Sequence, residues 1–152
     1  RFTYAELRAA VAQLAGCMAG RGVAAGDTVL VYMPAIPQAL MAMLACARLG
    51  AVHAVVFGGF GARELAARIA LARPKLVLAA SCGLEPGRVV PYLPTIDEAL
   101  SLVPDVAPRM LVWQRPECIA TLRDGRDEAW QDVVPSSPEA AVRPVAAEHP
   151  LY

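Results

Sequence analysis

The residues best suited to bind a ligand are the glycines of FGGFG, from Phe57 to Gly61. They follow an apolar run and precede a helical pattern, so the free amides at the start of that helix could meet an anion such as a phosphate. Neither of the common glycine-rich nucleotide motifs, GxGxxG and GxxxxGK[ST], occurs in the sequence. The turn therefore indicates a candidate anion site and leaves its ligand open.

The other chemically capable residues form no complete catalytic set. There is no GxSxG elbow, and His53 lies within an apolar strand pattern that is typical of a structural histidine. Asp97 and Glu98 stand near a predicted helix start, where the helix dipole accounts for them as caps. No CxxC pair is present, so we expect no metal site and predict free thiols in a reducing compartment at Cys17, Cys46, Cys82 and Cys118.

Composition excludes several classes of protein. The 152 residues are 57% hydrophobic, which is enough to bury the core of one domain and too apolar for a disordered chain. The 14 basic and 14 acidic residues balance, so the charge that draws proteins to nucleic acid or anionic lipid is missing. The uncharged run 28–47 contains Pro34 and Pro37, which favours strand, turn and buried helix over a membrane span. We expect a cytoplasmic α/β protein.

The elements that would position the glycine turn alternate along the chain. A capping box at Thr3 and Glu6 predicts a first helix. Apolar β-branched runs predict parallel strands at 28–33, 51–57, 75–80 and 109–113, and helical periodicity predicts helices at 39–49, 62–72 and 96–103. Such alternation predicts a partial flavodoxin-like parallel sheet flanked by helices on both faces. The proline-rich segment 114–152 reads as an irregular connection with one short helix near 128–133.

Three stretches carry a resemblance to a known family. The run GVAAGDTVLVYMPAIPQALMAMLACARLGAVHAVVFGGFGARELAARI, residues 22–69, resembles the acyl-CoA synthetases of the adenylate-forming superfamily, in the branch that activates acetate and propionate. CGLEPGRVVPYLPTIDEAL, residues 82–100, is similar to the propionyl-CoA synthetase and short-chain family member 3 type. The closing AEHPLY is similar to the lead-in to the family's phosphate loop. The resemblance implies that residues 1–152 are a fragment of the larger N-terminal AMP-binding domain.

The resemblance implies a two-step ligase that uses ATP, CoA and Mg²⁺. ATP and a small carboxylate, propionate rather than acetate, would give an acyl-adenylate and pyrophosphate, and CoA would then give the thioester. The family's phosphate loop, acyl pocket and lid lie outside these residues, so we expect the fragment alone to be inactive and to bind no cofactor tightly. We also expect self-association through the incomplete sheet. The resemblance implies a cytoplasmic enzyme, or one of the mitochondrial matrix in a eukaryote.

The resemblance implies a CoA-binding site in these residues and implies no catalytic residue. Arg88 is the strongest candidate, because a guanidinium can grip phosphate oxygens through two hydrogen bonds. Glu85 departs from the acetate enzymes, which have a basic residue there, and its charge would repel a phosphate. Two alternatives stay open: a turn that needs small residues whatever the ligand, and a nonenzymatic nucleotide-binding or partner-binding module. The expected cofactor-binding residues are Phe57, Gly58, Gly59, Glu85, Pro86, Gly87 and Arg88.

Overall fold

The first helix begins where the capping box predicts it. The computed structural model describes residues 2–152, and helix α1 spans Tyr4–Gly20. The Glu6 amide donates to Thr3 Oγ1 at 3.2 Å, and the Thr3 amide donates to Glu6 Oε2 at 2.7 Å. These reciprocal bonds satisfy amides that a first helical turn leaves without partners. One face of α1 buries Leu14 and Met18 in the core.

Five parallel strands form the central sheet. Its order is β2-β1-β3-β6-β7, and every neighbouring pair in it is parallel. The three inner strands are almost continuously apolar because helices cover both faces of the sheet. The predicted α/β class with a parallel sheet is confirmed. The strands are β1 (Thr28–Met33), β2 (Val52–Phe57), β3 (Leu76–Ala80), β6 (Arg109–Trp113) and β7 (Asp127–Ala129).

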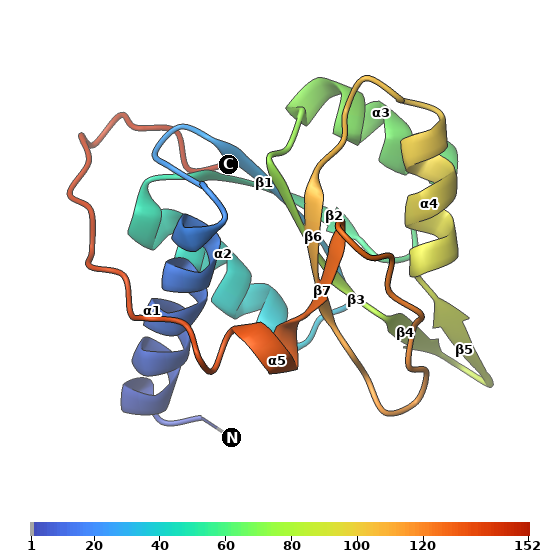
Figure 1. The fold of residues 1–152 in the computed structure, drawn as a ribbon, viewed down its shortest axis with the longest axis horizontal. Helices are drawn as coiled ribbons and strands as arrows, with labels where there is room; N and C mark the ends of the chain where they lie inside the picture. Colours follow the sequence, from blue (N-terminus) through green and yellow to red (C-terminus); the bar gives the residue numbers. More distant parts are fainter. Residues whose placement is uncertain (1) are drawn as a thin grey trace.

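Two layers of helices enclose this sheet. Helices α1 and α2 pack together on one face, and α3 and α4 pack together on the other (Figure 1). The further helices are α2 (Pro37–Leu49), α3 (Ala62–Ala72), α4 (Leu93–Ser101) and the single turn α5 (Trp130–Val133). Within residues 2–152, none of these helices is both long and apolar enough to cross a membrane.

The stretch after β3 differs from the loop that the sequence pattern predicts. It forms an antiparallel hairpin of β4 (Cys82–Glu85) and β5 (Arg88–Pro91), which projects beside α4 (Figure 1). Pro86 and Gly87 make its turn, and Gly87 has φ 78°, as the third position of a type II turn requires. The hairpin gives the segment 82–91 a fixed backbone that a loop would lack.

The prediction that Asp97 and Glu98 cap a helix is wrong. Helix α4 starts at Leu93, so Asp97 lies in its second turn, and no acidic residue lies in its first. The Asp97 carboxylate instead accepts hydrogen bonds from Arg123 Nη2 at 2.8 Å and from Arg126 Nη1 at 2.7 Å. It therefore ties α4 to the loop between β6 and β7.

The last forty residues join the fold at several places. Strand β7, which the sequence pattern does not predict, pairs with β6. Beyond α5 the chain is extended and crosses α1 and α2 (Figure 1). The Ala140 amide donates to the Ala12 carbonyl at 3.0 Å, and the His53 amide of β2 donates to the Leu151 carbonyl at 3.0 Å. This segment thus covers one helical layer and ends at the edge strand β2.

Candidate functional site

A cavity of about 330 Å³ lies at the carboxyl ends of the sheet strands. The order β2-β1-β3 means that the chain leaves β1 toward one side for β2 and returns to its other side for β3. In open parallel sheets, ligands bind at such a switch point, where neighbouring connections part. This cavity is lined by Pro34, Ala35, Ile36, Phe57, Gly59, Leu84, Glu85, Tyr92 and Arg115.

Two of the predicted glycine-turn residues line this cavity. Phe57 is 63% exposed, so its ring offers an apolar surface to a ligand. Gly59 lies next to it, and a Cβ at Gly59 would come within 2.8 Å of the Phe57 ring. The glycine therefore lets the Phe57 side chain lie back against the turn.

Two tyrosines support this turn by hydrogen bonding and packing. Tyr32 of β1 donates through its hydroxyl to the Phe60 carbonyl at 2.8 Å and lies 3.1 Å from the Gly58 carbonyl oxygen. The Tyr92 ring packs 5.0 Å from the Tyr32 ring, and a Cβ at Gly58 would overlap it. Close packing thus requires a glycine at position 58. This supports, at that position, the alternative that the turn needs small residues whatever the ligand.

Burial keeps both hydroxyls in the protonated form. It raises the pKa of Tyr32 to about 12 and also raises the pKa of Tyr92. A neutral phenol can donate a hydrogen bond, as Tyr32 does to the turn. The tyrosine pair is therefore a support for the turn at neutral pH and not a source of negative charge in the cavity.

The predicted phosphate-binding hairpin contains an ion pair. Arg88 Nε lies 2.7 Å and Nη2 2.5 Å from the same carboxylate oxygen of Glu85. Glu85 lines the cavity, whereas Arg88 sits at the exposed tip with 69% of its side chain accessible. An exposed pair of this kind contributes about 0 to 1 kcal/mol, so a stronger anion can take Glu85's place. We expected the Glu85 carboxylate to repel a phosphate; in the ligand-free chain it neutralises Arg88.

Sequence reasoning missed the one basic residue that lines this cavity within the described chain, Arg115. It follows the carboxyl end of β6, and only 13% of its side chain is exposed. Its Nη1 donates to the Cys82 carbonyl at 3.2 Å, and its backbone amide donates to Ser81 Oγ at 2.8 Å. The signal that could have found it is its place just after a parallel strand, on the ligand-binding side of such sheets.

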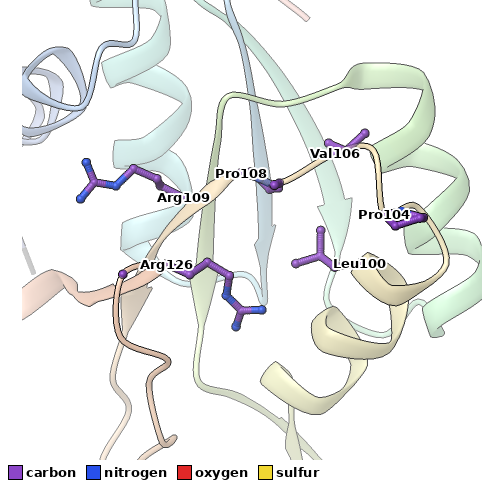
Figure 2. Close-up of a pocket in the computed structure, with 8 residues that line it drawn as sticks. Leu100, Pro104, Val106, Pro108, Arg109 and Arg126 are labelled. Carbon is purple, nitrogen blue, oxygen red and sulfur yellow. The ribbon is translucent and has the colours of Figure 1, made fainter.

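A second pocket, of about 420 Å³, opens at the other end of β6 and is shown in Figure 2. Arg109 and Arg126 line it together with Leu100 and Pro108. Its arginines are already engaged: Arg126 with Asp97 and Asp127, and Arg109 Nη2 with Glu128 Oε2 at 3.1 Å. We therefore place the candidate ligand site at the carboxyl ends of the strands.

Comparison with known proteins decides the family. The AMP-binding enzyme family matches residues 1–152, which is the whole chain. The chain belongs to this family. Human acyl-CoA synthetase short-chain family member 3, a mitochondrial protein, is 45% identical over 152 residues, which cover 99% of this chain and 22% of that protein. Acetyl-coenzyme A synthetase of Beijerinckia indica is 42% identical over 151 residues, covering 99% of this chain and 23% of the relative.

The fold is similar to that of part of a solved protein. Acetoacetyl-CoA synthetase from Streptomyces lividans superposes with a TM-score of 0.85 at 29% identity, covering 98% of this chain and 22% of that one. The resemblance drawn from the sequence is thus confirmed, and the chain spans less than a quarter of the length of these relatives. Which of the seven expected site residues contact CoA stays a prediction.

Proposed function

We propose that this AMP-binding chain forms part of an AMP-forming acyl-CoA ligase, and that its cavity receives the nucleotide portion of CoA. The observation that carries the proposal is the meeting of two sequence-distant segments at one cavity, the Phe57–Gly59 turn and the hairpin that bears Glu85 and Arg88. The names of the relatives, which are acetyl-CoA and short-chain acyl-CoA synthetases, support the ligase activity.

The cavity offers the groups that a phosphorylated nucleotide needs. The exposed Phe57 ring can stack on adenine, and Gly59 lines the cavity beside it, so its backbone is within reach of a ligand. Arg88 can release Glu85 and turn its guanidinium to a phosphate, a charge-assisted bond about twice as strong as a neutral one. Pro86 and Gly87 fix the turn that presents it. CoA supplies the thiol that accepts the acyl group, and the role of this chain is to hold its nucleotide end.

ATP and Mg²⁺ are proposed to bind other parts of the ligase, because the resemblance places the family's phosphate loop outside these residues. The carboxylate substrate is proposed to be propionate rather than acetate, because residues 82–100 resemble the propionate type. The cytoplasm is the proposed location, with the mitochondrial matrix as the alternative in a eukaryote, since the human relative is mitochondrial.

The test is turnover by the longer polypeptide that contains this chain. We expect AMP formation that requires ATP, CoA and a short carboxylate together, with kcat/KM roughly tenfold higher for propionate than for acetate, since one methylene in a fitted pocket gives about that discrimination. A preference for acetate would overturn the substrate assignment alone. The absence of carboxylate-dependent AMP formation with every acid from acetate to hexanoate would overturn the ligase proposal.

A further inference from the structure

We propose that Arg115 is a second phosphate-binding residue of the CoA nucleotide site, located inside the cavity, whereas Arg88 lies at its exposed rim. This inference rests on the proposed function, because it assigns a further residue to the same site. Among the described residues that line the cavity, Arg115 is the only lysine or arginine. Its position two residues after β6 puts it on the ligand side of the sheet.

The hydrogen bonds of Arg115 leave most of its donors free. A guanidinium has five N–H donors. Here one nitrogen, Nη1, donates to the Cys82 carbonyl at 3.2 Å, and Nε lies 3.5 Å from a Glu117 carboxylate oxygen, too far for a good hydrogen bond. A charged side chain that is only 13% exposed needs a close counter-charge or hydrogen-bond acceptors. A bound phosphate would supply both.

The charges around Arg115 also favour an anion. The Glu85 carboxylate is neutralised by Arg88, and Glu117 is 37% exposed, so it can turn into solvent when a ligand arrives. Burial raises the pKa of Tyr92; the Arg115 guanidinium opposes that rise more strongly than the Glu85 carboxylate adds to it, so the positive charge prevails at the cavity wall that Tyr92 forms.

The backbone around Arg115 is fixed before any ligand binds. Its amide donates to Ser81 Oγ at 2.8 Å, and the Ser81 amide donates to the Trp113 carbonyl at 2.9 Å. Arg115 also forms a β-bridge with Cys118. Its guanidinium is largely buried and donates to the Cys82 carbonyl, so it loses little further freedom on binding, which favours affinity. Arg115 thus differs from Arg88, whose side chain reaches out from a hairpin tip.

The experiment is an NMR titration of the 152-residue chain with adenosine 3′,5′-bisphosphate, and with adenosine as a phosphate-free probe. We expect the bisphosphate to bind weakly, with a millimolar dissociation constant, but more tightly than adenosine. Arg115→Gln should weaken bisphosphate binding about tenfold or more, the usual effect of losing a charged hydrogen bond, and leave adenosine binding within about twofold. Arg115→Lys, which keeps the charge, should restore part of the affinity.

The matched control is Arg109→Gln, at the opposite end of the same strand, where the arginine also pairs with a glutamate. It should leave both dissociation constants unchanged. A merely structural role for Arg115 would weaken the two probes equally, and this result would overturn the proposal. Unchanged bisphosphate binding in Arg115→Gln, or a parent chain that binds both probes alike, would also overturn it. The titration needs no turnover, so its failure is distinguishable from failure of the ligase proposal.

Discussion

The Arg21 guanidinium holds the Glu128 carboxylate through two hydrogen bonds, from Nε to Oε2 at 2.8 Å and from Nη2 to Oε1 at 2.7 Å. Arg21 directly follows α1 as its C-terminal cap, and Glu128 lies in β7, more than a hundred residues later. Only 12% of the Arg21 side chain is exposed. The pair therefore joins the start of the chain to the last strand of the sheet.

This pair predicts an acid-sensitive contribution to stability. The hydrogen bond from Arg21 lowers the pKa of Glu128 below its usual value of 4.5. A carboxyl group with a lowered folded-state pKa contributes stability above its unfolded-state pKa, and this contribution is lost as the pH falls through the folded-state value. We expect Glu128→Gln to be less stable than the parent at pH 7, with the difference shrinking below about pH 4.5.

Urea unfolding between pH 7 and pH 3 measures that difference. The control is Glu139→Gln, at an exposed glutamate that forms no ion pair within residues 2–152. The control should track the parent at every pH. A gap between parent and Glu128→Gln that stays constant down to pH 3 would show that the pair does not contribute through its charge.

The packing of the carboxyl-terminal segment on α1 predicts a stability difference between two glycines of one helix. A Cβ at Gly16 would overlap the backbone carbonyl of Pro138, which cannot rotate away, whereas a Cβ at Gly20 meets nothing within 4 Å. Gly16→Ala should therefore destabilise the chain by about 1 to 3 kcal/mol. Gly20→Ala should stabilise it by about 0.4 to 1 kcal/mol. Chemical unfolding measures the stability of both variants. Equal effects of the two substitutions would show that the carboxyl-terminal segment does not pack on α1 at Gly16.

The isolated 152-residue chain should catalyse no exchange of pyrophosphate into ATP in the presence of propionate. Its residues include no Ser-, Thr- and Gly-rich loop ending in lysine, and catalysis of phosphoryl and adenylyl transfer depends on positioned charge around the phosphates. Radiolabelled pyrophosphate gives the readout, and the proposed ligase is the positive control. Robust exchange by the purified chain would contradict our assignment of the ATP site to other residues.

In the proposed ligase, Arg88→Ala should raise the apparent Michaelis constant for CoA by about ten- to a hundredfold, because a charged hydrogen bond to phosphate is lost. Pyrophosphate exchange should stay within about threefold of the parent, since the proposed adenylation step does not use CoA. Dephospho-CoA distinguishes the phosphates: if Arg88 binds the 3′-phosphate, the variant should barely discriminate between the two cofactors. An unchanged CoA dependence would remove Arg88 from the site, and equal loss of both half-reactions would indicate misfolding.

Much of the fold is predictable because its inner strands are buried on both faces. The apolar run 28–33 and the periodic stretch 62–72 gave the bounds of β1 and α3 without error. Strand β7 escaped prediction because it has three residues, DEA, two of them charged, and is defined only by its partner β6. The hairpin escaped because its turn sequence EPGR resembles a polar loop, and pairing across it is a property of the backbone.

The candidate site also has one part that the sequence predicts and another that needs the structure. Local sequence pattern marks the Phe57–Gly59 turn, and the cavity lies beside it. The sequence places Arg115 just after a predicted strand, but its relevance depends on the order of the strands, which brings the end of β6 near the connections after β1 and β3. Glu85 needed the structure for another reason: its partner Arg88 lies only three residues away, but their contact depends on the tightness of the Pro86-Gly87 turn.

The central place of β1 in the sheet has a consequence for how the chain folds. β1 is made early in synthesis, yet its two neighbours are β2 and β3, and both follow it in the sequence. Until those strands leave the ribosome, TVLVYM exposes two unpaired edges and two apolar faces. Parallel pairing between distant segments also forms slowly, because the chain loses the entropy of closing each long loop before the strand contacts that stabilise it can form. Aggregation during synthesis should therefore depend on delays between residues 33 and 76, and codon choice in that stretch should affect yield more than codon choice after residue 113.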